Sequence, residues 1–139
     1  MKIKEVMQKP VFVSPTATKK QLFAVAKRHP DTELFIVVDR QHRFLGDIHE
    51  NDLFLMLLPN ERFSDIGVNL AFDLEKKFFA TKAKELMRRH DITCSPDDDL
   101  LSVALRLAQE EVNEMPVVDA KDRVVGWINE GLLARHLRC

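Results

Sequence analysis

The side chains that could carry chemistry form no catalytic or metal-binding pattern in the sequence. The candidate nucleophiles are Ser14, Cys94 and Ser95, and no general base can be identified beside any of them. The histidines show neither the four-residue spacing nor the cysteine partners of a typical zinc site. They are His29, His42, His49, His90 and His136. We therefore expect no catalytic residue, no metal ligand and no bound cofactor, and we predict that the chain is not an enzyme.

Phosphate-binding loops and disulfide frameworks are also absent from the sequence. With four glycines, the chain has neither a Gly-x-x-x-x-Gly-Lys-Ser/Thr loop nor a Gly-x-Gly-x-x-Gly fingerprint. Its two cysteines, Cys94 and Cys139, lie 45 residues apart (139 − 94) and match no metal or disulfide spacing. This cysteine usage favours a reducing, cytoplasmic setting. We expect Cys94 to be a buried structural residue and Cys139 to be exposed.

Composition describes a small globular protein and excludes several classes of partner. The chain has 139 residues, of which 45% are hydrophobic and 31% are charged, a balance typical of a folded domain. Because 21 basic residues are balanced by 22 acidic ones, the chain has no net positive charge that would attract nucleic acid. We therefore do not expect nucleic acid as a ligand. No apolar stretch approaches the roughly 20 residues needed to span a bilayer, so we expect no membrane insertion. A stand-alone regulator and an excised module fit the sequence equally.

An internal repeat organises the chain. KIKEVM at 2–7 matches KAKELM at 82–87, an offset of 80 residues. The same offset relates VVD at 37–39 to VVD at 117–119, and FLGDI at 44–48 to VVGWI at 124–128. Between these blocks the Ser-Pro pair recurs at an offset of 81. Several matches in the same order indicate a duplication.

Each repeat predicts the same order of elements, α-β-α-β-β-α, in an α/β (α+β) fold with a small sheet and packed helices. A short helical turn leads to an extended segment that ends at Ser-Pro, followed by an amphipathic helix, a hairpin and a closing helix. In the first repeat, the helix, the two strands and the closing helix are expected at 17–29, 34–38, 44–48 and 50–58. In the second repeat, they are expected at 98–111, 116–118, 124–128 and 130–138.

The repeats predict a division of the chain at 1–58, 59–80 and 81–139. A repeat of roughly 55 residues is barely stable alone, so we expect the two to pack together about a pseudo-two-fold axis. The connecting segment 59–80 is too apolar to be a free linker, because it contains Phe63, Phe72, Phe78 and Phe79. We expect it to cover a sheet edge or a dimer seam; a flap that responds to ligand is the alternative.

The repeated motif Met-x-x…Ser-Pro…Val-Val-Asp…Gly-x-Ile resembles the tandem cystathionine-β-synthase (CBS) domain pair, also called a Bateman module. The resemblance covers nearly all of the chain outside residues 59–80 and implies the same fold. It also implies a pattern of Gly, a hydrophobic residue, any residue, Thr or Ser, two residues and Asp at the start of the last helix of each repeat. Here residues 46–52 read GDIHEND, and residues 126–132 read GWINEGL.

By this resemblance, Asp52 stands where the family places a ribose-binding aspartate. A carboxylate there can accept hydrogen bonds from both vicinal hydroxyls, while a hydroxyl or amide and the helix N-terminus meet the phosphate. His49 replaces the usual Thr or Ser and would supply a pH-dependent donor. Leu132 replaces the second aspartate, so we predict one competent site in each chain. The alternative reading of Asp52 is an acidic residue stabilised by the helix dipole with no ligand.

The resemblance also implies that the other repeat completes the site. The residues expected there are Ser95, Val112, Asn113, Glu114 and Met115, with Cys94 beside them. An adenine would lie on Ile48, Val112 and Met115 and would use backbone groups to pair its N1 and amino edge.

The implied function is a non-catalytic regulatory module that binds AMP, ADP, ATP or S-adenosylmethionine between the repeats and acts on an unknown effector protein. Adenine nucleotides as ligands would make it an energy sensor. By the same resemblance we expect a homodimer, with the long helices or the Phe-rich segment as the seam. The alternative is a ligand-free dimerisation or docking module whose site has decayed.

Overall fold

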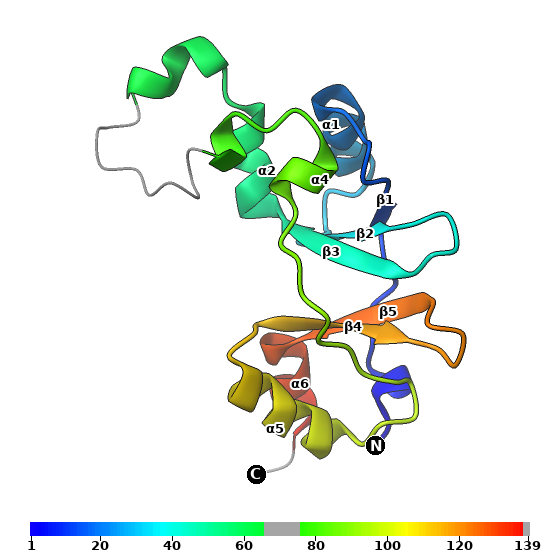
Figure 1. Ribbon diagram of the computed structural model, residues 1–139. Helices are drawn as coiled ribbons and strands as arrows, with labels where there is room; N and C mark the ends of the chain where they lie inside the picture. Colours follow the sequence, from blue (N-terminus) through cyan, green and yellow to red (C-terminus); the bar gives the residue numbers. More distant parts are fainter. Residues whose placement is uncertain (66–75, 138–139) are drawn as a thin grey trace. The chain divides into compact units, whose positions relative to one another are not determined.

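The computed structural model describes residues 1–65 and 76–137 as two compact units of mixed α/β structure (Figure 1). Unit 1 contains Met1–Pro10, Arg40–Phe44 and the chain from Asp91 onward, and unit 2 contains Val11–Asp39 and Leu45–His90. In each unit the helices cover one side of a small sheet. The predicted mixed α/β class is confirmed. Phe72 and Cys139 lie outside the described residues.

Unit 2 is built on a three-stranded sheet in the order β1-β2-β3. Strand β1 (Phe12–Val13) runs parallel to β2 (Leu34–Val38), with Phe12 opposite Ile36, and β3 (Phe44–His49) completes the sheet. All five residues of β2 are buried, as expected for a strand inside a core. The helical elements are α1 (Lys19–Arg28), α2 (Glu50–Leu57), the 3-10 helix η2 (Asn60–Asp65) and α4 (Ala83–Leu86).

Helix α1 begins at a capping box that the sequence encodes locally. The Thr18 hydroxyl accepts the Gln21 amide at 3.3 Å, and the Gln21 side chain accepts the Thr18 amide at 2.9 Å. Leu22 is buried and Val25 packs partly against the unit 2 core, which gives the helix its apolar face. The helix predicted at 17–29 is confirmed.

Unit 1 repeats this plan around an antiparallel pair of strands. Strand β4 (Glu114–Val118) pairs with β5 (Val124–Asn129), with Met115 opposite Ile128. The helical elements are the 3-10 helix η1 (Ile3–Glu5), α5 (Leu100–Glu110) and α6 (Glu130–His136). The side chain of Asp99 caps α5 by accepting the Ser102 amide at 3.3 Å.

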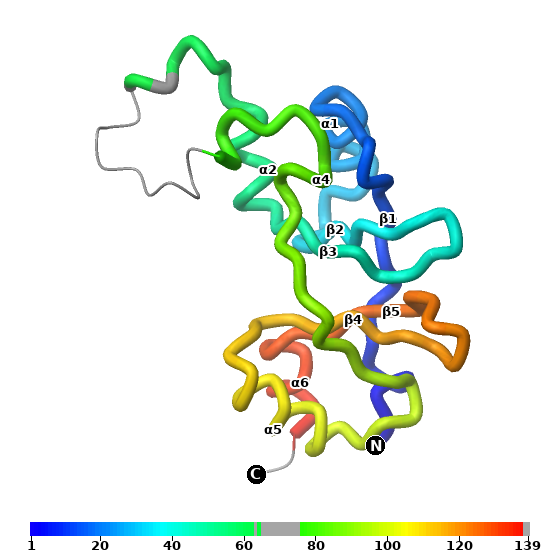
Figure 2. Tube along the Cα trace, viewed as in Figure 1, coloured from blue at the N-terminus to red at the C-terminus, as the bar shows by residue number. Residues whose placement is uncertain are grey.

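The two repeats exchange their N-terminal segments, as the trace in Figure 2 shows. Residues 1–10 pack in unit 1, where Ile3 is fully buried and Gln8 pairs through its backbone with Trp127 at 2.9 and 3.1 Å. Residues 81–90 pack in unit 2, where Ala83 is fully buried in the core. The compact units are therefore a different division of the chain from the predicted repeats, 1–58 and 81–139.

The glycine of the repeated motif allows each exchanged segment to approach its strand. A Cβ atom on Gly46 would lie 2.6 Å from the carbonyl oxygen of Arg88. One on Gly126 would lie 2.7 Å from Sδ of Met7 and 3.0 Å from the carbonyl oxygen of Gln8. The backbone contact at Gly46 is too short for any side chain, so the close pairing there requires glycine. At Gly126 a side chain would have to displace the Met7 side chain and press on the Gln8 carbonyl.

The described part of the connecting segment is anchored in unit 2. Residues 76–78 are helical, Phe78 is 1% exposed, and Ala80 belongs to the unit 2 core. The Phe78 and Phe79 rings meet edge to face, with centroids 5.1 Å apart and planes at 74°. A buried phenylalanine agrees with the expectation that this segment is not a free linker.

Candidate ligand site

The candidate site lies in unit 2, where β3 ends and α2 begins. His49 is the N-cap residue of α2 and has extended backbone angles, φ −79° and ψ 151°. The Glu50 amide donates to the Glu33 carbonyl at 3.0 Å, which ties the helix start to the residue before β2. Asp52 stands in the first turn of α2, where a carboxylate is stabilised by the helix dipole.

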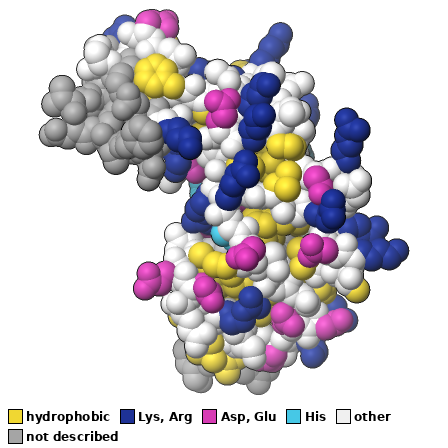
Figure 3. Space-filling view, viewed as in Figure 1, with side chains coloured by type: hydrophobic (Ala, Val, Ile, Leu, Met, Phe, Trp, Pro, Cys, Tyr) yellow, Lys and Arg dark blue, Asp and Glu magenta, His cyan; other side chains and the backbone are white. Residues whose placement is uncertain are grey.

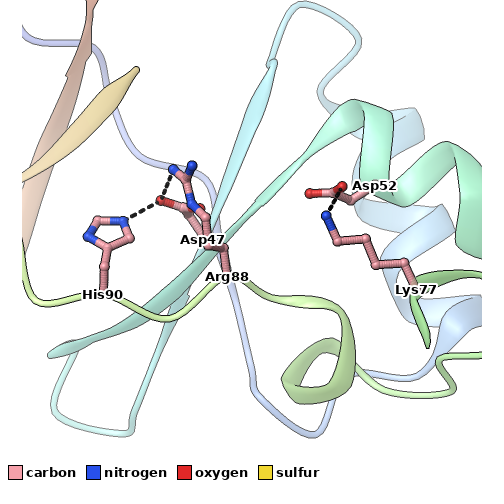
Figure 4. A network of polar contacts seen from close by, with 5 residues as sticks. All are labelled: Asp47, Asp52, Lys77, Arg88 and His90. Atoms are coloured by element: carbon pink, nitrogen blue, oxygen red, sulfur yellow. Dashed lines mark hydrogen bonds and ion pairs between the residues drawn. The ribbon is translucent and has the colours of Figure 1, made fainter. Parts of the chain in front are cut away.

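The carboxylate of Asp52 is held by Lys77 from the connecting segment (Figure 4). Lys77 Nζ donates to Asp52 Oδ1 at 2.7 Å. The pair is partly buried, because the Asp52 side chain is 15% exposed and the Lys77 side chain 30%. Lys77 was not among the predicted site residues. Its place in the sequence, between Lys76 and Phe78, carries no signal for a partner 25 residues earlier (77 − 52).

A second polar network surrounds Asp47, whose carboxylate is only 1% exposed (Figure 4). His90 Nε2 lies 2.9 Å from Asp47 Oδ2, and Arg88 Nη2 lies 3.5 Å from the same oxygen. Arg88 Nε approaches Oδ1 to 3.4 Å as an ion pair without hydrogen-bond geometry. The backbones of Asp47 and Arg88 also exchange two hydrogen bonds, of 3.0 and 2.8 Å. This network fixes the exchanged segment 81–90 against β3.

The predicted site residues form one group on each unit. In unit 2, His49 and Asp52 are partly exposed, whereas Ile48 is fully buried in the core. In unit 1, Ser95 and Asn113 are exposed and Val112 packs partly against the core. Glu114 and Met115 are buried in β4 at 3% and 0% exposure. The side chains of Ile48 and Met115 are therefore packed in the hydrophobic core of their own unit.

The second repeat places different chemistry at the equivalent positions. Leu132, at the position of Asp52, is 7% exposed and belongs to the unit 1 core. Asn129, at the position of His49, caps α6 by accepting the Leu132 amide at 2.7 Å. In this repeat, the position of the aspartate therefore packs in the core, and the position of the Thr or Ser caps the helix.

The remaining candidate chemistry is structural. Cys94 is 3% exposed, and burial, with a smaller contribution from Asp98, raises the pKa of its thiol to about 12. The thiol is therefore protonated near neutral pH and is a poor nucleophile, as expected for a buried structural cysteine. Among residues 1–65 and 76–137, no three His, Cys, Asp or Glu side chains gather where they could hold a metal ion. No helix in this described part is long and apolar enough to cross a membrane.

Comparison with known proteins identifies the family. The family model of the CBS domain matches residues 3–58 and again residues 83–138. The chain belongs to the CBS-domain family. The two matched regions coincide with the sequence repeats, so the recognition of a tandem CBS pair is confirmed.

Solved structures of CBS pairs share the fold at low sequence identity. The CBS domain of a membrane protein from Sphaerobacter thermophilus has a TM-score of 0.74 and 20% identity, covering 99% of this chain and 88% of that one. CBSX2 in complex with AMP has a TM-score of 0.73 and 17% identity, covering 97% and 94%. The CBS pair of protein MJ0100, in complex with 5′-methylthioadenosine and S-adenosyl-L-methionine, has a TM-score of 0.69 and 20% identity, covering 98% and 94%.

A curated relative matches over a shorter stretch. Over 82 residues the CBS pair is 29% identical to a homoserine O-acetyltransferase of Methanococcoides burtonii. The match includes 58% of this chain and 17% of that protein. The CBS pair thus corresponds to a small part of that enzyme's length.

Proposed function

We propose that this CBS pair is a non-catalytic regulatory module that binds an adenine nucleotide or another adenosyl ligand. The observation that carries the proposal is Asp52, a partly exposed carboxylate in the first turn of α2, at the family's ribose-binding position. The ligands named for similar CBS pairs support it: AMP for CBSX2, S-adenosyl-L-methionine for MJ0100 and ATP for the magnesium channel MgtE. The ligand would favour one arrangement of the module and so act on an effector.

Within this proposal, Asp52 accepts hydrogen bonds from the two ribose hydroxyls and His49 donates to a phosphate. The adenine edge pairs with backbone N–H and C=O groups near Ile48, since the Ile48 side chain belongs to the hydrophobic core of unit 2. Ser95, Val112, Asn113, Glu114 and Met115 stay ligand contacts that the family resemblance alone predicts. We further propose that the module works in the cytoplasm and that it responds to the energy state through competing nucleotides.

Thermal unfolding with added ligands tests this function directly. We expect AMP, ADP, ATP or S-adenosylmethionine at about 1 mM to raise the unfolding midpoint, with GMP as the control. A ligand at 100 times its dissociation constant adds about 2.7 kcal/mol to stability, which corresponds to roughly 8 °C for a chain of this size. Asp52→Ala should abolish the shift. Asn51→Ala, an exposed neighbour on the same helix, should retain it.

A chain whose midpoint does not move with any adenine compound would contradict the sensor function. A dimer insensitive to every nucleotide would instead indicate a docking module with a decayed site. Nucleic acid is the weaker candidate ligand because the net charge is −1, and the face in Figure 3 carries side chains of both signs. If the chain binds a polynucleotide and the affinity falls with added salt, nucleic acid becomes the favoured ligand.

We also propose that two copies associate through the apolar face of α5 and α6. Leu101 and Leu105, one helical turn apart on α5, are 57% and 56% exposed. Beside them α5 and α6 form a shallow groove of about 340 Å³. Its lining residues are Ala104, Leu107, Ala108, Glu130, Leu133, Ala134 and Leu137. Exposed apolar side chains that gather on one face mark a site of association, and a two-fold dimer would bring the same face of each copy together.

Light scattering after gel filtration measures this association. We expect the wild type at twice the chain mass of 16.1 kDa and Leu101→Glu/Leu105→Glu at the monomer mass, because charges buried in an apolar interface oppose association. Phe79→Glu makes the same kind of change on an exposed residue of the connecting segment and should stay dimeric. A monomeric Phe79→Glu variant, with the double leucine variant dimeric, would place the seam at the Phe-rich segment instead.

A further inference from the structure

We propose that Lys77 makes the Asp52 site selective for adenine ligands that carry negative charge. In the free protein the ammonium group holds the carboxylate; when a ribose takes the carboxylate, the same ammonium group binds the ligand's phosphate. This inference rests on the proposed function and names the class of ligand for it: adenine nucleotides rather than adenosine or the cationic S-adenosylmethionine.

The contact between Lys77 and Asp52 is direct and leaves both groups able to change partners. Lys77 Nζ lies 2.7 Å from Asp52 Oδ1, and the two side chains are 30% and 15% exposed. The backbone of Lys77 is fixed by its neighbour Phe78, which is 1% exposed. The lysine side chain, in contrast, is a flexible four-carbon stem with a compact charge. The ammonium group can therefore move by a few ångströms while the turn that carries it stays in place.

Ribose binding disturbs this ion pair. Both vicinal hydroxyls donate to the carboxylate, so they compete with the ammonium group for its lone pairs. A neutral hydroxyl replaces a charged partner, and Lys77, which is only 30% exposed, loses much of its compensation. Adenosine offers nothing in return. S-adenosylmethionine adds its own positive charge near the displaced lysine, which makes the exchange less favourable.

A phosphate reverses this balance. A phosphomonoester carries a charge of about −1.5 to −2 near neutral pH and three acceptor oxygens, so it can replace Asp52 as the partner of the ammonium group. The first turn of α2 itself carries the acidic residues Glu50 and Asp52, which repel an anion. The positive charge of Lys77 offsets that repulsion beside Asp52. The start of α2 can therefore bind an anionic nucleotide although it carries two acidic residues.

Calorimetric titration of the full chain with adenosine, AMP and S-adenosylmethionine tests the selectivity. For Lys77→Met we expect AMP affinity to fall about tenfold, the loss of one charge-assisted hydrogen bond. Adenosine and S-adenosylmethionine affinities should rise several-fold, because their competitor is gone. Lys77→Arg retains the charge and should keep the preference for AMP. Lys76→Met, an exposed neighbour with the same change in net charge, should leave the ratio of affinities within about twofold.

The opposite signs for AMP and adenosine separate this role from a structural one, since a damaged site loses all three ligands together. Three affinities that fall in parallel in Lys77→Met, while the wild type binds, would overturn the selectivity and leave the proposed function standing. A wild type that binds none of the three would overturn both. If Lys77→Met does not fold, the wild type alone decides: a preference for AMP over adenosine that persists undiminished in high salt would contradict an ammonium contact.

Discussion

Replacing Asp47 by alanine is expected to lower the free energy of unfolding by about 3 kcal/mol, because the variant breaks a buried polar network. The carboxylate is 1% exposed and is the shared partner of His90 and Arg88. His90, 11% exposed, would lose a partner that water cannot fully replace, whereas Arg88, 41% exposed, can be hydrated. The segment 81–90 would also be held less firmly against β3. Urea unfolding followed by circular dichroism measures the change.

Asp119→Ala is the matched control for this experiment. Asp119 forms an ion pair with Arg123 at 3.1 Å on the hairpin turn of the second repeat. Hydrogen bonds from Arg123 and Lys121 lower the pKa of its carboxyl, but the side chains of Arg123 and Asp119 are 51% and 25% exposed, so water screens the contribution of the pair. We therefore expect a much smaller loss than for Asp47. Equal losses in the two variants would show that the Asp47 network contributes no more to stability than a solvated turn.

Phe78→Ala is expected to lower the free energy of unfolding by about 3 kcal/mol or more. The side chain is 1% exposed, and truncating a buried phenylalanine removes its transfer free energy and leaves a cavity. Phe78 is also the residue beside Lys77, so the loss should be accompanied by weaker AMP binding. The same unfolding measurement, together with calorimetric titration of AMP, gives both results.

Phe79→Ala provides the comparison, because Phe79 is the next residue and is 41% exposed. Truncation at Phe79 should lower the free energy of unfolding by no more than about 1 kcal/mol, since much of this residue already contacts water in the folded state. A Phe78 variant as stable as the Phe79 variant would mean that the connecting segment adds little to the unit 2 core. The expected anchoring of Lys77 would then fail as well.

Much of the secondary structure follows from local pattern. The strand predicted at 34–38 is β2, and the helix predicted at 98–111 is α5, Leu100–Glu110. Strand β4 begins at Glu114, two residues before the predicted start at Pro116, because Glu114 and Met115 pair with Asn129 and Ile128. Glutamate is uncommon in buried strands, so the sequence pattern did not predict Glu114 as a strand residue. Its place in β4 follows from its pairing with Asn129.

The candidate site was predicted in part. The motif at 46–52 located Asp52 and His49 at the start of α2 because a repeated pattern marks the junction of strand and helix. The same pattern suggested Ile48 as an apolar platform, yet alternation along β3 turns that side chain into the core. Lys77 and His90 were not predicted, because their partners lie 25 (77 − 52) and 43 (90 − 47) residues away and no local rule connects them.

The sequence by itself determined the duplication, the order of elements in each repeat, the family and the difference between Asp52 and Leu132. These features depend on residues close together in the chain, or on a comparison of one half with the other. Only the tertiary structure decided that residues 1–10 and 81–90 each pack with the opposite repeat, and that Lys77 holds Asp52. Such contacts join residues that are far apart in the chain and meet only when it has folded. No periodic pattern in the sequence predicts them.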